Sequence, residues 1–136
     1  MAERQKLGAV SPCFIVSDAS RAVNFYTAKL GFELRFSEPA DQPFFAIVGR
    51  DLAQIFLKAI SAEVTAQPNP TRHEWAPWDA FVYVDDPDSL AAEFASRGVT
   101  FHAEIVNRKD GVRGFEVVDN DGYVLFFGAP IEEIAR

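Results

Sequence analysis

The chain has few of the residues that most often carry chemistry in proteins. Its 136 residues include one cysteine, Cys13, and two histidines, His73 and His102. A single cysteine excludes an internal disulfide and fits a reducing cytoplasm. The two histidines lie far apart in the sequence, without the short spacing typical of a histidine metal site. No basic residue lies near Cys13 in the sequence, so the cysteine does not resemble an activated nucleophile.

Long hydrophobic runs and basic charge are also scarce. No apolar run approaches the length of a membrane span, and the N-terminal residues lack the apolar core of a signal peptide. Thirteen Lys and Arg residues face 20 Asp and Glu residues, which gives a formal net charge of −7. This charge disfavours nucleic acid and anionic membranes as partners. We expect one cytoplasmic domain over residues 1–136, without a nucleic-acid or membrane partner.

What the chain does have is an internal repeat, with a period of about 70 residues. The segment Ser11–Asp18 leads into a helix-like apolar spacing that ends at Gly31, and Asp79–Asp86 leads into another that ends at Gly98. A tandem repeat of one supersecondary unit dictates the architecture and places a ligand cleft between equivalent positions. Each copy closes on a matching strand, Asp51–Ala59 in the first and Asp121–Ala129 in the second.

The hydrophobic pattern predicts the order β-α-β-β-β in both copies. The first copy, about 9–59, has predicted strands at 10–16, 32–36, 44–48 and 53–59, with a helix capped by Gly31. The second, about 78–129, has predicted strands at 79–84, 99–105, 114–118 and 123–127, with a helix after Pro87. The proline-containing segment 60–77 is the expected connection.

Two motifs carry a resemblance to a known family. They are Asn24-Phe-Tyr-x-x-x-Leu-Gly-Phe32 in the first copy and Asp119-x-Asp-Gly-Tyr123 in the second. With the repeat, they resemble the vicinal oxygen chelate superfamily of glyoxalases, bleomycin-resistance proteins and dioxygenases, over roughly residues 9–129. The resemblance implies an α+β fold in which two tandem βαβββ modules form curved sheets around a cleft. It also implies a homodimer, often with pockets completed across the subunit interface.

The resemblance further implies four strand positions at which enzymes of the family hold a divalent metal ion. In this chain Ser11, Phe56, Asp79 and Phe126 occupy them. Phenylalanine has no donor atom, neutral serine is a poor ligand, and one carboxylate holds a divalent ion weakly. We therefore expect no metal and no cofactor.

Strand alternation suggests what lines the cleft instead. The chain has 13 Phe, 3 Tyr and 2 Trp, and several of these rings share a face with sparse polar groups, as in small-molecule pockets. We predict a metal-independent binding protein, similar to bleomycin-resistance proteins, that sequesters an aromatic or cationic ligand. The candidate ligand-binding residues are Ser11, Cys13, Phe56, Trp75, Trp78, Asp79, Phe81, Tyr83, Arg113, Glu116 and Phe126.

Several of these candidates have a second interpretation. Asp79 either pairs with a ligand cation or faces solvent at the start of a strand. Trp75 and Trp78 either stack on the ligand or cover the end of the sheet or a dimer interface. Arg113 and Glu116 either bind polar groups of the ligand or form cross-strand ion pairs.

Two enzymatic hypotheses also stay open. One is a glyoxalase-type lyase or a dioxygenase with a non-standard metal site drawn from His73, His102, Asp79 and Glu116. The other is a metal-free lyase or isomerase with Asp79 as general base and Tyr83 as acid. It requires a buried Asp79 with a raised pKa.

Overall fold

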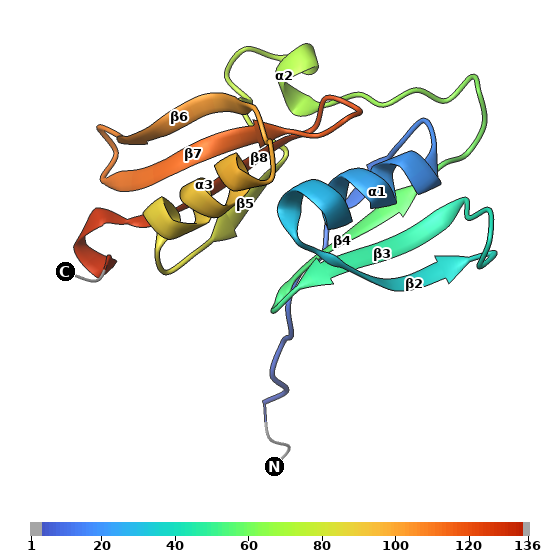
Figure 1. The fold of residues 1–136 in the computed structure, drawn as a ribbon, viewed down its shortest axis with the longest axis horizontal. Helices are drawn as coiled ribbons and strands as arrows, with labels where there is room; N and C mark the ends of the chain where they lie inside the picture. Colours follow the sequence, from blue (N-terminus) through green and yellow to red (C-terminus); the bar gives the residue numbers. More distant parts are fainter. Residues whose placement is uncertain (1–3, 135–136) are drawn as a thin grey trace.

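A computed structural model describes residues 4–134 and contains two βαβββ modules (Figure 1). The first comprises β1 (Cys13–Ile15), α1 (Ala19–Leu30), β2 (Glu33–Glu38), β3 (Phe45–Arg50) and β4 (Ala53–Lys58). The second comprises β5 (Ala80–Tyr83), α3 (Pro87–Ser96), β6 (Phe101–Asn107), β7 (Val112–Val118) and β8 (Val124–Pro130). A short helix, α2 (Asn69–Arg72), lies between the modules, and a 3-10 turn, η1 (Ile131–Glu133), follows β8. The predicted fold class is confirmed.

Each module forms its own four-stranded sheet, and the two sheets have the same topology. Sheet A has the strand order β1-β4-β3-β2, and sheet B has the order β5-β8-β7-β6. In each sheet the first strand pairs in parallel with the last, and the remaining pairs are antiparallel. The register places Cys13 opposite Phe56 in sheet A and Phe81 opposite Phe126 in sheet B. The sequence repeat is therefore a repeat in three dimensions.

Capping residues set the ends of α1. The Asp18 carboxylate accepts a hydrogen bond from the backbone N–H of Arg21, which satisfies a free donor of the first turn. Gly31 ends the helix with φ at 71°, a left-handed conformation that glycine adopts without steric cost.

One face of each sheet is covered by the helix of its own module, and neither α1 nor α3 lies on the opposite face. Alternating residues of β3 and β4 are buried towards α1, among them Val48 and Leu57. Phe115 and Phe127 of sheet B are buried with Phe94 of α3 in the same way. We call this opposite side of each sheet its open face.

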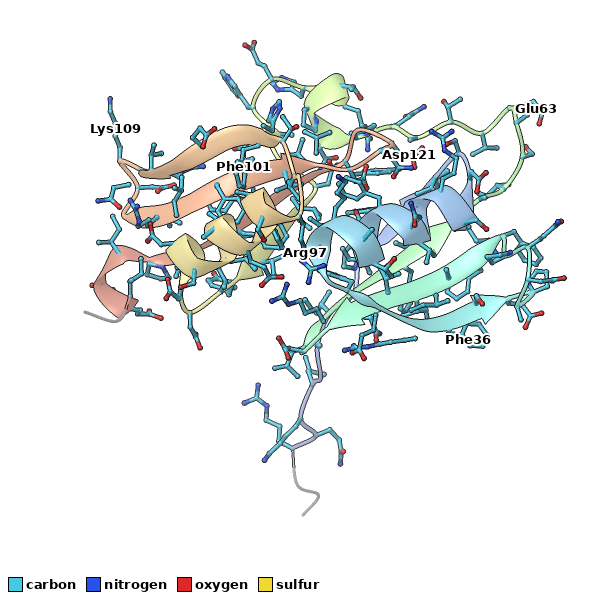
Figure 2. The ribbon with its side chains drawn as sticks, in the orientation of Figure 1. Phe36, Glu63, Arg97, Phe101, Lys109 and Asp121 are labelled. Atoms are coloured by element: carbon cyan, nitrogen blue, oxygen red, sulfur yellow. The ribbon has the colours of Figure 1, made fainter. Side chains whose placement is uncertain are left out.

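The two modules lie side by side, with α1 and α3 adjacent (Figure 1). The ring of Phe14 stacks on that of Tyr123, with centroids 4.2 Å apart, and the Tyr123 hydroxyl donates to the Ile15 carbonyl. The turn before β8 also contacts the segment that leads into α1, because the backbone N–H of Ser17 donates to Asp121, labelled in Figure 2. One hydrophobic core is thus shared between the modules.

An ionic network closes the junction at the other end of the helices. Arg50 donates both terminal nitrogens to Glu93 of α3, at 2.9 and 2.8 Å, and also donates to the Leu30 carbonyl. Arg97, labelled near the centre of Figure 2, donates to Glu93 and to the Ala28 carbonyl. Bidentate contacts of this kind fix orientation as well as distance.

The described helices are all too short or too polar to cross a membrane.

Candidate functional site

Of the four positions predicted from the resemblance, two lie in the sheets and two lie just before a strand. Phe56 and Phe126 lie on the inner strands β4 and β8, and both side chains belong to open faces. Ser11 precedes β1, and its hydroxyl lies 3.5 Å from the Gln54 amide nitrogen. Asp79 immediately precedes β5.

The Asp79 carboxylate is committed to the backbone. One oxygen accepts from the N–H of Asn69 at 2.7 Å, and the other accepts from the N–H of Val124 at 2.8 Å. Asp79 therefore fastens the connection between the modules to the start of β8. Each oxygen of this carboxylate therefore already has a backbone donor.

These four residues do not fit a divalent metal ion. Phe56 and Phe126 have no donor atoms, and both oxygens of Asp79 are already hydrogen-bonded. Within residues 4–134, no group of three or more His, Cys, Asp or Glu side chains is placed to hold a metal. The alternative ligand set is not assembled either: His102 and Glu116 are neighbours, whereas His73 lies in the connection and contacts Trp75.

The open face of sheet B carries an aromatic cluster, which we call patch B. The Phe81 ring lies 4.9 Å from that of Phe126, 5.4 Å from that of Trp78 and 4.6 Å from that of Tyr83. Phe126 forms the buried floor, at 2% exposure, while Tyr83 is 75% exposed. The indole N–H of Trp78 is buried and has no hydrogen-bond partner among residues 4–134. Patch B thus offers ring surface and one unpaired donor.

Two glycines allow the Phe126 ring to lie along the sheet. A Cβ atom added at either Gly114 or Gly128 would come within 2.6 Å of that ring. Both glycines are buried, so the absence of their side chains forms the slot that the ring fills.

A positive charge covers part of patch B. The guanidinium of Arg108 lies 5.0 Å from the Phe126 ring centroid and 5.6 Å from that of Trp78. These distances are typical of a cation–π contact. Arg108 also pairs with Asp110, at 3.1 Å.

The open face of sheet A carries a row of three rings, which we call patch A. Phe36, Phe45 and Phe56 come from neighbouring strands, with successive centroids 6.1 and 5.7 Å apart. Lys58 lies over Phe45, 5.5 Å from its centroid. Figure 2 labels Phe36, which is 47% exposed on the edge strand β2.

Glu116 and Arg113 lie on opposite sides of β7. Glu116 is opposite Phe126 in the ladder and belongs to the open face, where its carboxylate lies 3.8 Å from His102. Arg113 points to the helix side and donates two hydrogen bonds to Asp88 of α3. The structure therefore separates Arg113 from the other candidates.

Trp75 also lies apart from them. Its side chain is 85% exposed in the connection, and its ring packs edge-on against that of His73. Six other candidates are divided between the two open faces. Phe56 lies on that of sheet A, and the face of sheet B carries Trp78, Phe81, Tyr83, Glu116 and Phe126.

Two cavities involve other candidates. One, of about 670 Å³, lies between β1 and the connection, and its lining includes Cys13 and Asp79. The other, of about 540 Å³, lies at the module junction, and its lining includes Tyr83. Neither is lined by Phe56 or Phe126.

Three residues of these faces were not predicted from the sequence: Phe36, Phe45 and Arg108. Strand alternation could have found Phe45, because it lies on the same face as Phe56 across the β3–β4 hairpin. Arg108 lies in a turn, and no sequence pattern places it over distant rings.

Comparison with known proteins agrees with this fold. The family model described as "Glyoxalase/Bleomycin resistance protein/Dioxygenase superfamily" matches residues 7–127. A comparison with curated protein sequences found no match.

Several solved structures are similar to this chain. The bleomycin-binding protein from Streptomyces verticillus, complexed with copper(II)-bleomycin, is 24% identical with a TM-score of 0.66, covering 91% of this chain and 97% of its own. TioX from Micromonospora sp. ML1 is 17% identical with a TM-score of 0.70, covering 90% and 98%. TnmS3, an antibiotic-binding protein from Streptomyces sp. CB03234, is 21% identical with a TM-score of 0.65, covering 94% and 99%. These likenesses show a shared fold, and the family match covers most of the sequence. The chain belongs to the glyoxalase/bleomycin resistance protein/dioxygenase superfamily.

Proposed function

We propose that this protein binds an aromatic or cationic small molecule between its aromatic open faces, without a metal ion. The observation that carries the proposal is the pair of patches: each sheet presents a row of rings on the face opposite the helix of its own module. Small-molecule sites typically combine such apolar walls with a few polar groups. Sequestration requires no catalytic constellation.

We further propose that a second copy of the chain completes the site. Each patch is one wall, and exposed rings such as Phe36 and Tyr83 leave apolar surface uncovered. In a symmetric dimer, patch A of one copy would face patch B of the other, which forms two equivalent sites.

The similar structures support a binding role. Two of them are a bleomycin-binding protein and an antibiotic-binding protein. The Asp79 carboxylate, which a metal-free lyase would use as a base, is held by two backbone donors. The exposed thiol of Cys13 is consistent with the cytoplasmic location that we also propose.

Calorimetric titration and sedimentation test the proposal. The purified protein is titrated with copper(II)-bleomycin and with the N-methylphenanthridinium ion, and its mass is measured by analytical ultracentrifugation. We expect a dimer that binds at least one probe, and we expect Phe56→Asp to abolish binding and dissociate the dimer. Leu52→Asp is the matched control, because Leu52 is 85% exposed in the β3–β4 turn, outside both patches. A protein that binds neither probe, or a Phe56→Asp variant that binds normally, would refute the proposal.

A further inference from the structure

Glu116 is an acid without a hydrogen-bond partner on the open face of sheet B. Its side chain is only 15% exposed, and the imidazole of His102 lies 3.8 Å from the carboxylate, beyond hydrogen-bond distance. Its oxygens still reach water, because neither is among the buried side-chain atoms of residues 4–134 that lack a hydrogen-bond partner. A donor or a cation that replaced this water could pair with the carboxylate.

Three other acids at covered positions are already satisfied, whereas Asp121, in the turn before β8, accepts from Ser17 and keeps one buried oxygen without a partner among residues 4–134. Asp79 accepts two backbone N–H groups, and Glu93 accepts from Arg50 and Arg97. Asp119 accepts from a tyrosine hydroxyl and two backbone N–H groups. These carboxylates hold the fold together, whereas the contacts of Glu116 leave it free to pair with a molecule that arrives from outside.

Glu116 lies directly beside patch B. It is opposite Phe126 in the β7–β8 ladder, and cross-strand neighbours have Cβ atoms about 5 Å apart. Trp78 and Phe81 pack on the same Phe126 ring. An aromatic ligand on these rings would therefore bring its substituents within reach of the carboxylate.

The protein itself shows that patch B attracts cations. The Arg108 guanidinium lies over the Trp78 and Phe126 rings. Arg108 lies in the β6–β7 turn, outside both strands, so its side chain can move without breaking the ladder. It occupies ring surface that a ligand would need, and its charge repels another cation nearby.

The geometry points to a flat aromatic cation as the ligand, with its charge paired to Glu116, its rings on Trp78 and Phe81, and Arg108 displaced. This inference rests on the proposed binding function and adds the residue that selects for charge. Glu116, in place of Asp79, is then the residue that pairs with the ligand cation. Arg108 acts as an internal competitor, so the two residues have opposite effects on affinity.

A matched pair of probes tests the inference. N-methylphenanthridinium and phenanthridine have the same three fused rings, and at pH 8 only the first is charged. Their dissociation constants are measured by calorimetry for the wild-type protein and for Glu116→Gln and Arg108→Gln. Glu104→Gln is the control, because it removes the same charge from an exposed position of β6.

We expect Glu116→Gln to raise the dissociation constant of N-methylphenanthridinium by about tenfold or more, the effect of one charge-assisted interaction. The dissociation constant of phenanthridine should not change. Arg108→Gln should lower the dissociation constant of the cation several-fold, and Glu104→Gln should change the dissociation constant of neither probe. Equal losses for both probes in Glu116→Gln, or no loss, would overturn the assignment of Glu116. Weaker cation binding in Arg108→Gln would overturn the displacement. If the wild-type protein binds neither probe, the proposed function fails together with this inference.

Discussion

The Tyr26 hydroxyl donates a 2.6 Å hydrogen bond to the carboxylate of Asp119, and both side chains are buried. Tyr26 belongs to α1 of the first module, and Asp119 begins the turn before β8 of the second. The bond therefore joins two motifs that lie 93 residues apart in the sequence. It is one of the contacts through which the repeat becomes a single folded unit.

Removing the Tyr26 hydroxyl should destabilise this junction. Tyr26→Phe keeps the ring but leaves one Asp119 oxygen without its donor, so we expect the free energy of unfolding to fall by about 1–3 kcal/mol. Equilibrium unfolding in urea measures the change. The control is Thr27→Val, which removes a hydroxyl that bonds within α1 and makes no contact between modules. A Tyr26→Phe variant as stable as the wild type would show that the contact contributes nothing.

Ionisation of Asp119 should make stability depend on pH. Burial raises the pKa of Asp119 from 3.8 to about 6, although the three donors around it favour the charged form. A group with a raised pKa in the folded state stabilises fully below its unfolded pKa, and this contribution is lost as the pH rises through about 6. Two units of pKa correspond to about 3 kcal/mol.

Asp119→Asn isolates this dependence. The difference in unfolding free energy, wild type minus variant, should decrease by up to about 3 kcal/mol between pH 4 and pH 7, because the other titrating groups cancel. Urea unfolding at pH steps of half a unit gives this difference. A difference that stays constant or rises with pH contradicts the assignment.

The role of Asp79 in the backbone predicts a loss of stability on mutation. In Asp79→Asn the amide NH₂ must face one of the N–H groups of Asn69 and Val124, which should cost about 1–3 kcal/mol. Asp18→Asn is the control, since asparagine caps a helix about as well as aspartate. We expect the preference of Asp79→Asn for N-methylphenanthridinium over phenanthridine to equal that of the wild type. Loss of this preference would show that Asp79, and not Glu116, selects for the charge of the ligand.

The slot for the Phe126 ring predicts that Gly128 tolerates no side chain. A Cβ atom there would lie 2.6 Å from the ring and 2.7 Å from the Arg113 carbonyl oxygen, so Gly128→Ala should cost about 1–3 kcal/mol. It should also alter the near-ultraviolet circular dichroism of patch B. Gly8→Ala, with no atom within 4 Å of the added Cβ, should change neither measurement. Equal stability of the two variants would mean that the ring moves freely.

Much of the fold could be predicted from local pattern. Gly31 ends α1 as expected, and the two copies have the same strand order. The bounds of individual strands differ from those predicted. The strand predicted at 10–16 contains only Cys13–Ile15, and the one at 99–105 lies at Phe101–Asn107. Strand ends depend on pairing with distant residues, which local propensity does not contain.

The sequence by itself determined the duplicated architecture, the family and the loss of metal-donor atoms at Phe56 and Phe126, because periodicity and side-chain chemistry are local properties. Alternation could also have separated Arg113 from Glu116, since residues three apart on a strand lie on opposite faces. Only the tertiary structure decided which of two candidate carboxylates, Asp79 or Glu116, has no hydrogen bond from the backbone. Asp79 is satisfied by backbone groups of two other segments and Glu116 is not, and hydrogen bonds between distant segments exist only once the chain has folded.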